Sequence, residues 1–239
     1  MPSTRPKIAV IIPALNEEVP LPKVLADIPP GLVEEVVVVD NGSSDRTAEV
    51  ARACGVTVLI EPRRGYGSAC LTGIAYLKTK NPDIVVFLDG DYSDYPEEMP
   101  AVLRPILMEG YDLVIGSRRK GEAETGALLP QARLGNALAT WLIRLLYGFT
   151  YSDLGPFRAV CFEKLLALGM TDQDYGWTVE MQVKAVKGGL KITEVPVRYR
   201  KRIGQSKVTG TWKGTMMAGY KILWTIVRHW RRPALAAEE

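Results

Sequence analysis

Short runs of β-branched and other apolar residues alternate with amphipathic stretches along the first half of the chain. Five such runs predict strands at residues 7–12, 35–40, 56–60, 84–89 and 113–116. Helices are predicted between them, at roughly 21–28, 45–54, 67–78 and 96–109. Strands that are apolar on both faces and separated by single helices are typical of a parallel sheet with helices on both faces. The first half therefore predicts an α/β fold.

The pattern changes from about Lys120 onwards. Here we predict an apolar helix at 133–149, a loop at 152–159, a helix at 172–187, a strand at 191–199, a basic segment at 200–210 and a final helix at about 212–230. We find neither an internal repeat nor a low-complexity linker. We therefore predict one domain over residues 1–210, followed by a C-terminal amphipathic helix and tail over residues 211–239.

Composition narrows the classes of function. The 239 residues are 47% hydrophobic and 24% charged, as in ordinary globular proteins. Three scattered cysteines, never spaced as CxxC, disfavour a disulfide framework or a zinc site and fit a reducing compartment. The single histidine, His229, lies in a basic and aromatic setting, which disfavours Ser–His–Asp or Cys–His catalysis. No signal peptide and no run of about 18 apolar residues is found, so a spanning helix is not expected.

The formal net charge of +3 conceals an asymmetry. Residues 1–180 contain 17 Lys and Arg against 24 Asp and Glu, whereas residues 181–239 contain 13 against 3. A basic C-terminal part on an acidic body predicts a polyanionic partner, such as a diphosphate, an anionic lipid or nucleic acid. No recognition-helix motif accompanies the basic residues, so we do not expect nucleic acid to be the partner.

Two predicted strands end in aspartate, Asp40 and Asp89. Parallel sheets bind ligands at the carboxyl ends of their strands. The turn Asp89-Gly90-Asp91 brings two carboxylates together, where they could share Mg²⁺ or Mn²⁺ with a nucleotide diphosphate. A DxD sequence alone is more commonly a polar turn, but its position at a strand end favours the metal site. Asp40 is placed to accept a hydrogen bond from a base or a ribose.

Two loops at the same predicted sheet edge add candidates. The loop 13–18 (PALNEE) could wrap around a nucleoside, although a strand-to-helix connection explains it equally well. The segment 63–67 (RRGYG) precedes a helix, and a helix N-terminus with nearby glycines and arginines favours an anion. An exposed turn is the alternative. For residues 41–45 (NGSSD) we expect only a turn and a helix cap.

The motifs IPALNEE, VVVVDNGSSDRT, RRGYGSA, FLDGDYSD, VIGSRR, SDLGPFRA and EVPVRYRKRIGQSK follow one another along the chain. In this order they resemble the family 2 glycosyltransferases of the GT-A (Rossmann-like) fold, and most closely the dolichyl-phosphate or polyprenyl-phosphate mannose and glucose synthases. The resemblance covers roughly residues 7–210. It implies inverting, metal-dependent transfer of a sugar from a nucleotide sugar of the GDP-mannose or UDP-glucose type to a dolichyl or undecaprenyl phosphate.

The resemblance also implies roles for individual residues. Those that would hold the nucleotide sugar are Pro13, Ala14, Asn16, Glu17, Asp40, Arg64, Gly67, Asp89, Gly90, Arg202 and Lys207. The last two would also close over the donor and stabilise the leaving diphosphate. Asp89 and Asp91 would hold Mg²⁺ or Mn²⁺, and Asp91 is placed among the catalytic residues. Arg118 and Arg133 would receive the phosphate of the lipid acceptor.

The chain departs from the family pattern near the acceptor. Asp94 stands where the family usually has His or a similar polar residue, and the stretch DLGPFR, from Asp153, is one residue shorter and contains Pro156. A phosphate acceptor needs no general base. An acceptor hydroxyl, soluble or on a glycan, is the alternative, and Asp153 is then the candidate base, with a polar turn equally plausible. Solvated positions are the alternative for all the arginines, above all for Arg119 and Arg158.

The predicted C-terminal helix has one apolar stripe, formed by Met216, Tyr220, Leu223, Trp224 and Val227. Basic residues flank the stripe, and tryptophans lie along the helix. This pattern predicts a helix on a membrane surface, and hence a cytoplasmic protein peripherally associated with the membrane. Packing of the stripe on the catalytic domain or a second subunit is the alternative, so an oligomer is possible. The apolar segment 138–146 fits a second lipid-facing element and core burial equally.

Overall fold

The structure is a computed structural model, which describes residues 5–204 and 212–230, apart from the side chains of 212–215. The strands are β1 (Ile8–Ala14), β2 (Glu35–Asp40), β3 (Thr57–Ile60), β4 (Ile84–Phe87), β5 (Leu113–Ser117), β6 (Arg158–Cys161) and β7 (Ile192–Pro196). The helices are α1 (Leu21–Ala26), α2 (Thr47–Ala53), α3 (Tyr66–Leu77), α4 (Met99–Glu109), α5 (Pro130–Tyr147), α6 (Phe162–Ala167), α7 (Trp177–Lys187) and α8 (Trp212–Trp230). A 3₁₀ turn, η1 (Pro96–Glu98), precedes α4.

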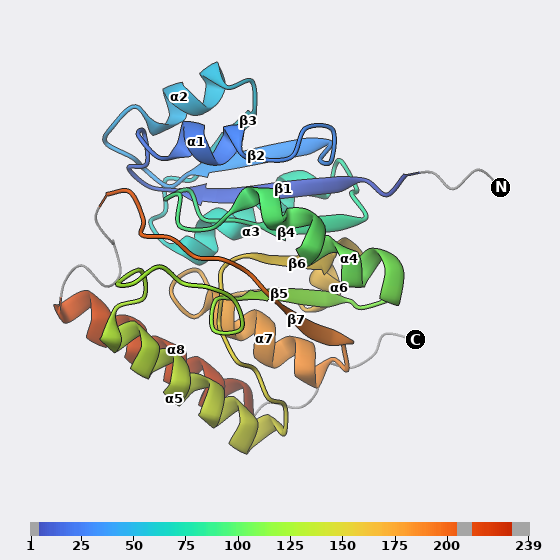
Figure 1. Cartoon of the computed structure of the whole chain (residues 1–239), viewed down its shortest axis with the longest axis vertical. Helices are drawn as coiled ribbons and strands as arrows, with labels where there is room; N and C mark the ends of the chain where they lie inside the picture. Colours follow the sequence, from blue (N-terminus) through green and yellow to red (C-terminus); the bar gives the residue numbers. More distant parts are fainter. Residues whose placement is uncertain (1–4, 205–211, 231–239) are drawn as a thin grey trace.

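The strands form one sheet in the order β3-β2-β1-β4-β6-β5-β7 (Figure 1). All neighbouring pairs are parallel except those of β6, which runs antiparallel to both β4 and β5. The central strands are buried on both faces, as their continuous apolar runs predict. The predicted α/β fold with a mostly parallel sheet is confirmed.

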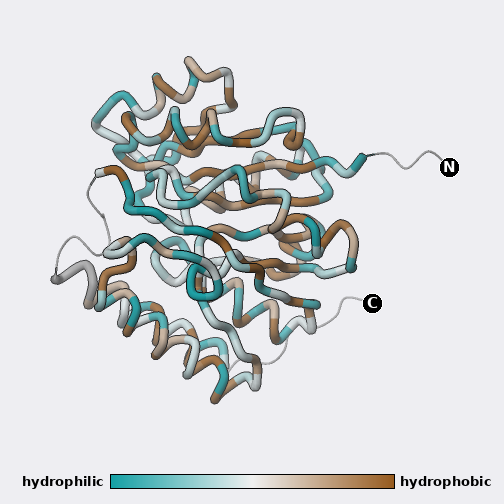
Figure 2. Tube along the Cα trace, in the orientation of Figure 1, coloured by the Kyte–Doolittle hydropathy of each residue, from teal (hydrophilic) through white to brown (hydrophobic). Residues whose placement is uncertain are grey.

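Two apolar layers separate the sheet from its helices. On one face, α1, α2 and α4 pack through residues such as Val24 and Leu103. On the other face, α3, α5, α6, α7 and α8 pack through residues such as Ile74, Trp177 and Ile226. Figure 2 shows hydrophobic residues concentrated along the strands between these layers. Helices on both faces were expected and are confirmed.

The predicted loop at 152–159 is partly wrong, because β6 begins inside it at Arg158 and leads directly into α6. The expected solvated position of Arg158 is also wrong. Its side chain is 2% exposed, and its guanidinium donates to the main-chain oxygens of Leu154, Gly155 and Thr178. Arg119, by contrast, is exposed as expected.

Helix α8 packs with one side against the body of the protein. Thr225, Ile226 and His229 are buried, and the Tyr147 hydroxyl of α5 donates to the Ile226 oxygen at 2.5 Å. Trp224, on the predicted stripe, is exposed. The helix therefore combines a packed side with an exposed apolar side. Among the described helices, none has both the length and the apolar character needed to cross a bilayer.

Candidate active site

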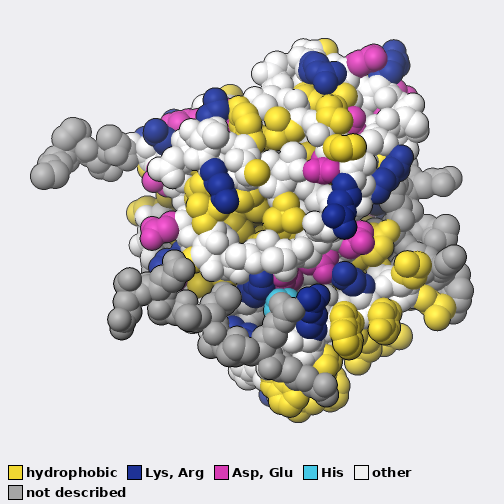
Figure 3. Space-filling model, turned by 180° about the vertical axis from the view of Figure 1, so that it is seen from behind, with side chains coloured by type: hydrophobic (Ala, Val, Ile, Leu, Met, Phe, Trp, Pro, Cys, Tyr) yellow, Lys and Arg dark blue, Asp and Glu magenta, His cyan; other side chains and the backbone are white. Residues whose placement is uncertain are grey.

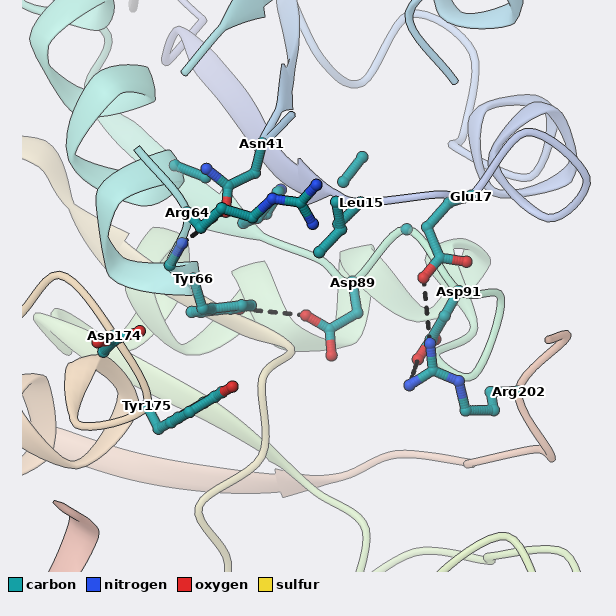
Figure 4. Close-up of a pocket in the computed structure, with 15 residues that line it drawn as sticks. Leu15, Glu17, Asn41, Arg64, Tyr66, Asp89, Asp91, Asp174, Tyr175 and Arg202 are labelled. Atoms are coloured by element: carbon teal, nitrogen blue, oxygen red, sulfur yellow. Dashed lines mark hydrogen bonds and ion pairs between the residues drawn. The ribbon is translucent and has the colours of Figure 1, made fainter. Parts of the chain in front are cut away.

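A pocket of about 500 Å³ opens at the carboxyl ends of β1, β2 and β4 (Figure 4). Its lining residues come from the loops after these strands, from the start of α3, from the loop before α7 and from the segment after β7. They are Pro13, Ala14, Leu15, Glu17, Asn41, Arg64, Gly65, Tyr66, Ala69, Asp89, Gly90, Asp91, Asp174, Tyr175 and Arg202. Many of the residues predicted to hold a donor are thus brought together.

Asp89 and Asp91 lie just after β4 at the wall of this first pocket. Burial, and next the charge of Asp91, raise the pKa of Asp89 to about 7. Oδ1 of Asp91 accepts hydrogen bonds from the main-chain nitrogen and the hydroxyl of Ser93. Its Oδ2 forms an ion pair of 3.1 Å with Arg202, which also lies 3.1 Å from Glu17. A cationic side chain thus lies beside these carboxylates.

The aspartate pair fits a divalent cation that arrives with a substrate. Within residues 5–204 and 212–230, no three His, Cys, Asp or Glu side chains are arranged to hold a metal ion by themselves. Two hard carboxylates, completed by phosphate oxygens and water, are the usual surroundings of Mg²⁺ in nucleotide sites. Asp89 and Asp91 could therefore hold a cation that bridges to a diphosphate.

The loops after β1 and β2 are tied to each other beside the pocket. Asn16 has a positive φ of 54°, and its side-chain oxygen accepts from the Ser44 nitrogen at 2.7 Å. Asp40 is buried and accepts from the Ser43 nitrogen at 3.0 Å, whereas its neighbour Asn41 lines the pocket. Asn16 and Asp40 therefore connect the two loops at the rim of the pocket, and their predicted contact with a nucleoside stays a prediction.

The glycines at the start of α3 face another protein segment. Gly65 has a φ of 143°, and a Cβ on Gly65 or Gly67 would overlap main-chain oxygens of the loop 171–176. The Ser68 nitrogen donates to the Gln173 oxygen at 2.9 Å. The close approach that Gly67 permits is therefore to this loop, where we had expected an anion. Arg64 does line the pocket and donates to the Gly42 oxygen at 2.8 Å.

The loop 171–176 supplies two pocket residues that sequence reasoning missed, Asp174 and Tyr175. Glu180 of α7, fully buried, accepts from the nitrogens of Thr171 and Asp172. Lys221 of α8 forms an ion pair of 3.2 Å with Asp172. The wall of the first pocket is therefore anchored on both α7 and α8.

A second pocket, of about 630 Å³, lies between the end of β5 and the start of α5. Its lining residues are Arg118, Arg119, Gly121, Ala123, Leu128, Ala132, Arg133, Leu134, Asn136, Ala137 and Asp153. Arg118 and Arg133, predicted as partners in phosphate binding, thus line one pocket although they come from different elements. Arg133 is exposed on the first turn of α5.

Asp153 anchors Arg118. Its carboxylate accepts from Nε and Nη2 of Arg118 at 2.8 and 2.7 Å, and from the Arg118 and Leu154 nitrogens. Burial disfavours the charged form of Arg118, but the attraction of the Asp153 carboxylate is the stronger effect. The pKa of the guanidinium is therefore raised. Asp153 is 1% exposed, so it is poorly placed to take a proton from a substrate.

Asp94 lies beneath the DxD turn and is 2% exposed. Its Oδ1 has no hydrogen-bond partner among the described residues, and Oδ2 accepts only a long bond of 3.5 Å from the Asp89 nitrogen. Burial, and next the charges of Asp89 and Asp91, raise the pKa of Asp94 well above its usual range.

Lys207, predicted to act with Arg202, lies outside the described residues.

Comparisons with known proteins agree with this geometry. The model of the family "Glycosyl transferase family 2" matches residues 9–165. An uncharacterized glycosyltransferase of Mycobacterium tuberculosis is 38% identical over 88% of this chain and 94% of its own length. A dolichyl-phosphate hexose transferase of Haloferax volcanii is 35% identical over 84% of this chain and 86% of its own.

A solved structure shares the fold. Glucosyl-3-phosphoglycerate synthase from Mycobacterium tuberculosis, crystallised with Mn²⁺, UDP and glucosyl-3-phosphoglycerate, matches with a TM-score of 0.74 and 25% identity. The match covers 95% of this chain and 81% of that chain.

Proposed function

This chain belongs to glycosyltransferase family 2, and from that premise we propose that it moves a sugar from a nucleotide sugar to a polyprenyl phosphate. Such enzymes need a donor site with carboxylates and an acceptor site with cations at one sheet edge. The observation that carries the proposal is the second pocket, which both Arg118, just after β5, and Arg133, on the first turn of α5, line. Two guanidinium groups suit a phosphate acceptor.

In the proposed reaction, an oxygen of the acceptor phosphate attacks C1 of the donor sugar. The bond between C1 and the diphosphate oxygen breaks, and the nucleoside diphosphate leaves with that electron pair while C1 inverts. Arg118 and Arg133 position the acceptor, whose oxygen is already ionised near neutral pH. Arg202 is placed to neutralise the leaving diphosphate. Bound Mg²⁺ or Mn²⁺ would add Lewis-acid stabilisation of that same charge.

The alternative of a hydroxyl acceptor requires a free base. Asp153, the candidate for that role, is held by four hydrogen bonds from Arg118 and Leu154. These bonds engage both oxygens of a carboxylate that is 1% exposed, so an acceptor hydroxyl has little access to either oxygen. This contact pattern favours the phosphate acceptor.

An exposed apolar face supports a lipid acceptor. Helices α5 and α8 lie side by side (Figure 1), and hydrophobic side chains gather at this end of the molecule (Figure 3). The exposed residues are Leu134, Leu138, Trp141 and Leu145 of α5 and Met216, Met217, Tyr220 and Trp224 of α8. We name this set the α5–α8 face. We propose that it lies on the cytoplasmic surface of a membrane, with α5 as the second lipid-facing element.

A phase-partition assay tests the function. Purified protein is incubated with Mn²⁺ or Mg²⁺, a polyprenyl phosphate in detergent, and radiolabelled UDP-glucose or GDP-mannose in turn. We expect label to move into the organic phase with one donor, and the Asp91→Asn variant to lose this transfer. Label that stays aqueous with every donor, while nucleoside diphosphate is released, would contradict the lipid acceptor and indicate a hydroxyl acceptor.

A further inference from the structure

The four oxygens of the aspartate pair are engaged differently. Both oxygens of Asp91 have partners, Ser93 for Oδ1 and Arg202 for Oδ2. Oδ1 of Asp89 accepts a hydrogen bond of 3.1 Å from the Tyr66 hydroxyl (Figure 4). Across the described ranges, no side chain donates to Oδ2 of Asp89. Tyr66 is thus the described side chain that orients the Asp89 carboxylate.

The position of Tyr66 is set by its neighbours. It is the first residue of α3, between Gly65 and Gly67, both of which are pressed against main-chain oxygens of the loop 171–176. Because a Cβ would not fit at either glycine, this stretch of backbone has little room to move. The ring projects into the first pocket towards Asp89 (Figure 4).

The Tyr66 hydroxyl lies on the Asp89 side of the first pocket and donates to the carboxylate. A phenol carries one proton to donate, and here that proton is directed at Oδ1. The arrangement leaves Oδ2 of Asp89 for a cation.

We propose that Tyr66 is a positioning residue, which holds the Asp89 carboxylate in the orientation that receives a divalent cation. It acts through Asp89 and does not touch the cation. This inference rests on the proposed function, because it takes the cation to be part of donor binding. Carboxylate ligands of metals are commonly held by such hydrogen bonds, and losing one lowers metal affinity 10- to 100-fold.

The test compares two tyrosines that line the same pocket. Tyr66→Phe removes the hydroxyl that binds Asp89, whereas Tyr175→Phe removes one that no described hydrogen bond joins to Asp89. Binding of Mn²⁺ alone is measured from the electron paramagnetic resonance signal of free Mn²⁺, and then again with UDP or GDP present. We expect about tenfold weaker Mn²⁺ binding for Tyr66→Phe and no more than twofold for Tyr175→Phe.

Two further measurements separate positioning from other roles. Binding of UDP and GDP without metal should be unchanged in Tyr66→Phe, because the residue acts through Asp89. In an Asp89→Asn background, the added Tyr66→Phe change should have no further effect on nucleotide binding with Mn²⁺. Circular dichroism melts of the same variants show whether the fold is retained.

Unchanged Mn²⁺ binding by Tyr66→Phe would overturn the inference, as would an equal loss of nucleotide binding without metal, since that loss means direct contact with the donor. A chain that binds no Mn²⁺ even with UDP or GDP would also overturn it. Because Mn²⁺ binding requires neither sugar nor acceptor, the result is independent of the phase-partition assay. If sugar transfer occurs but Tyr66→Phe does not weaken Mn²⁺ binding, the proposed function holds and the role of Tyr66 fails. If Tyr66→Phe weakens Mn²⁺ binding but no sugar is transferred, the role of Tyr66 holds and the proposed function fails.

Discussion

Arg202 acts as a counter-ion to the carboxylates of Asp91 and Glu17. Its guanidinium lies 3.1 Å from both Asp91 and Glu17, so positive charge already balances these buried carboxylates. A divalent cation must therefore compete with this arginine for Oδ2 of Asp91. A diphosphate that draws Arg202 to itself would free that oxygen, which makes joint arrival of cation and donor favourable.

Arg202→Gln should therefore change two measurements in opposite directions. Mn²⁺ alone should bind about fivefold more tightly, because Asp91 loses its competing partner. Sugar transfer should fall about 100-fold, because the charge of the leaving group loses a stabilising cation. The matched control is Arg198→Gln, in the same segment but paired with Glu98 outside the pocket. Weaker binding of Mn²⁺ alone in Arg202→Gln would refute the counter-ion role.

Asp153→Asn should affect acceptor binding more than donor binding. Loss of a carboxylate that holds a buried guanidinium costs about 3 kcal/mol in the free energy of unfolding. Because Arg118 is then less well oriented, we expect the KM for polyprenyl phosphate to rise about tenfold, with the Kd of the nucleotide unchanged. Urea unfolding and initial rates check both. The control is Asp112→Asn, because Asp112 directly precedes the first residue of β5, at the end of the strand away from Arg118. Complete loss of turnover with an unchanged KM would indicate a base.

At this scale, residues at strand ends are predictable and contacts between distant loops are not. The positions of Asp89 and Asp91 follow from the apolar run before them, and the motif order points to Arg118 and Arg133. Glu17 and Arg202 form an ion pair although they lie 185 positions apart, and no local sequence pattern predicts this contact. The positions of Tyr66, Asp174 and Tyr175 likewise depend on how the loop 171–176 packs against the start of α3, which the local sequence does not determine.

Among the elements, β6 escapes prediction for a physical reason. Its four residues, Arg158–Cys161, include a charged residue and only one β-branched residue. Its place in the sheet depends on pairing with β4 and β5, which lie far away in the sequence. Strand β4 is equally short, but its residues Ile84–Phe87 are all apolar and buried, so its composition alone indicates it.

The α5–α8 face combines an exposed apolar row from each of two packed helices. Trp141 and Trp224 are 57% and 51% exposed, although tryptophan is on average a well-buried residue. An apolar face of this kind is costly in water and marks a surface for lipid or protein. Basic residues on the same helices, Arg133, Arg144 and Lys221, favour an anionic surface.

We expect the double change Trp141→Glu and Trp224→Glu to weaken binding to vesicles of phosphatidylcholine and phosphatidylglycerol about 100-fold. Co-sedimentation with the vesicles measures this binding. The control is Met108→Glu, which is even more exposed to solvent, at 77%, but lies on α4, which packs on the opposite face of the sheet. Vesicle binding that survives the double change, or no binding by the unsubstituted chain, would contradict the membrane proposal. A concentration-dependent dimer would then indicate a second subunit.

On the scale of the whole molecule, helix α8 and the first pocket are physically joined. Lys221 of α8 pairs with Asp172, and a Cβ on Gly176 would overlap the Thr225 hydroxyl of α8. The loop 171–176 between them forms part of the pocket wall. A displacement of α8 should therefore be transmitted to the wall of the first pocket.

Removing this link should weaken donor binding without touching the pocket itself. For Lys221→Met we expect about fivefold weaker binding of UDP or GDP in the presence of Mn²⁺, because a partly exposed ion pair contributes about 1 kcal/mol. Isothermal titration calorimetry measures the affinity. Arg228→Met, on an exposed position of the same helix, is the control. Equal affinities for both variants and the unsubstituted chain would show that the loop 171–176 keeps its position without the ion pair to α8.

Arg133 and Leu134 are consecutive residues that both line the second pocket, and Leu134 also belongs to the α5–α8 face. The border between the arginine-lined second pocket and the apolar α5–α8 face is thus a single residue wide. Lifting a prenyl tail into water costs about 0.8 kcal/mol for each methylene group. For the proposed acceptor that cost is avoided, since its headgroup can be reached while its tail stays among neighbouring lipids. The search for acceptor then becomes lateral diffusion in a plane, and turnover should follow the surface density of polyprenyl phosphate rather than its bulk concentration.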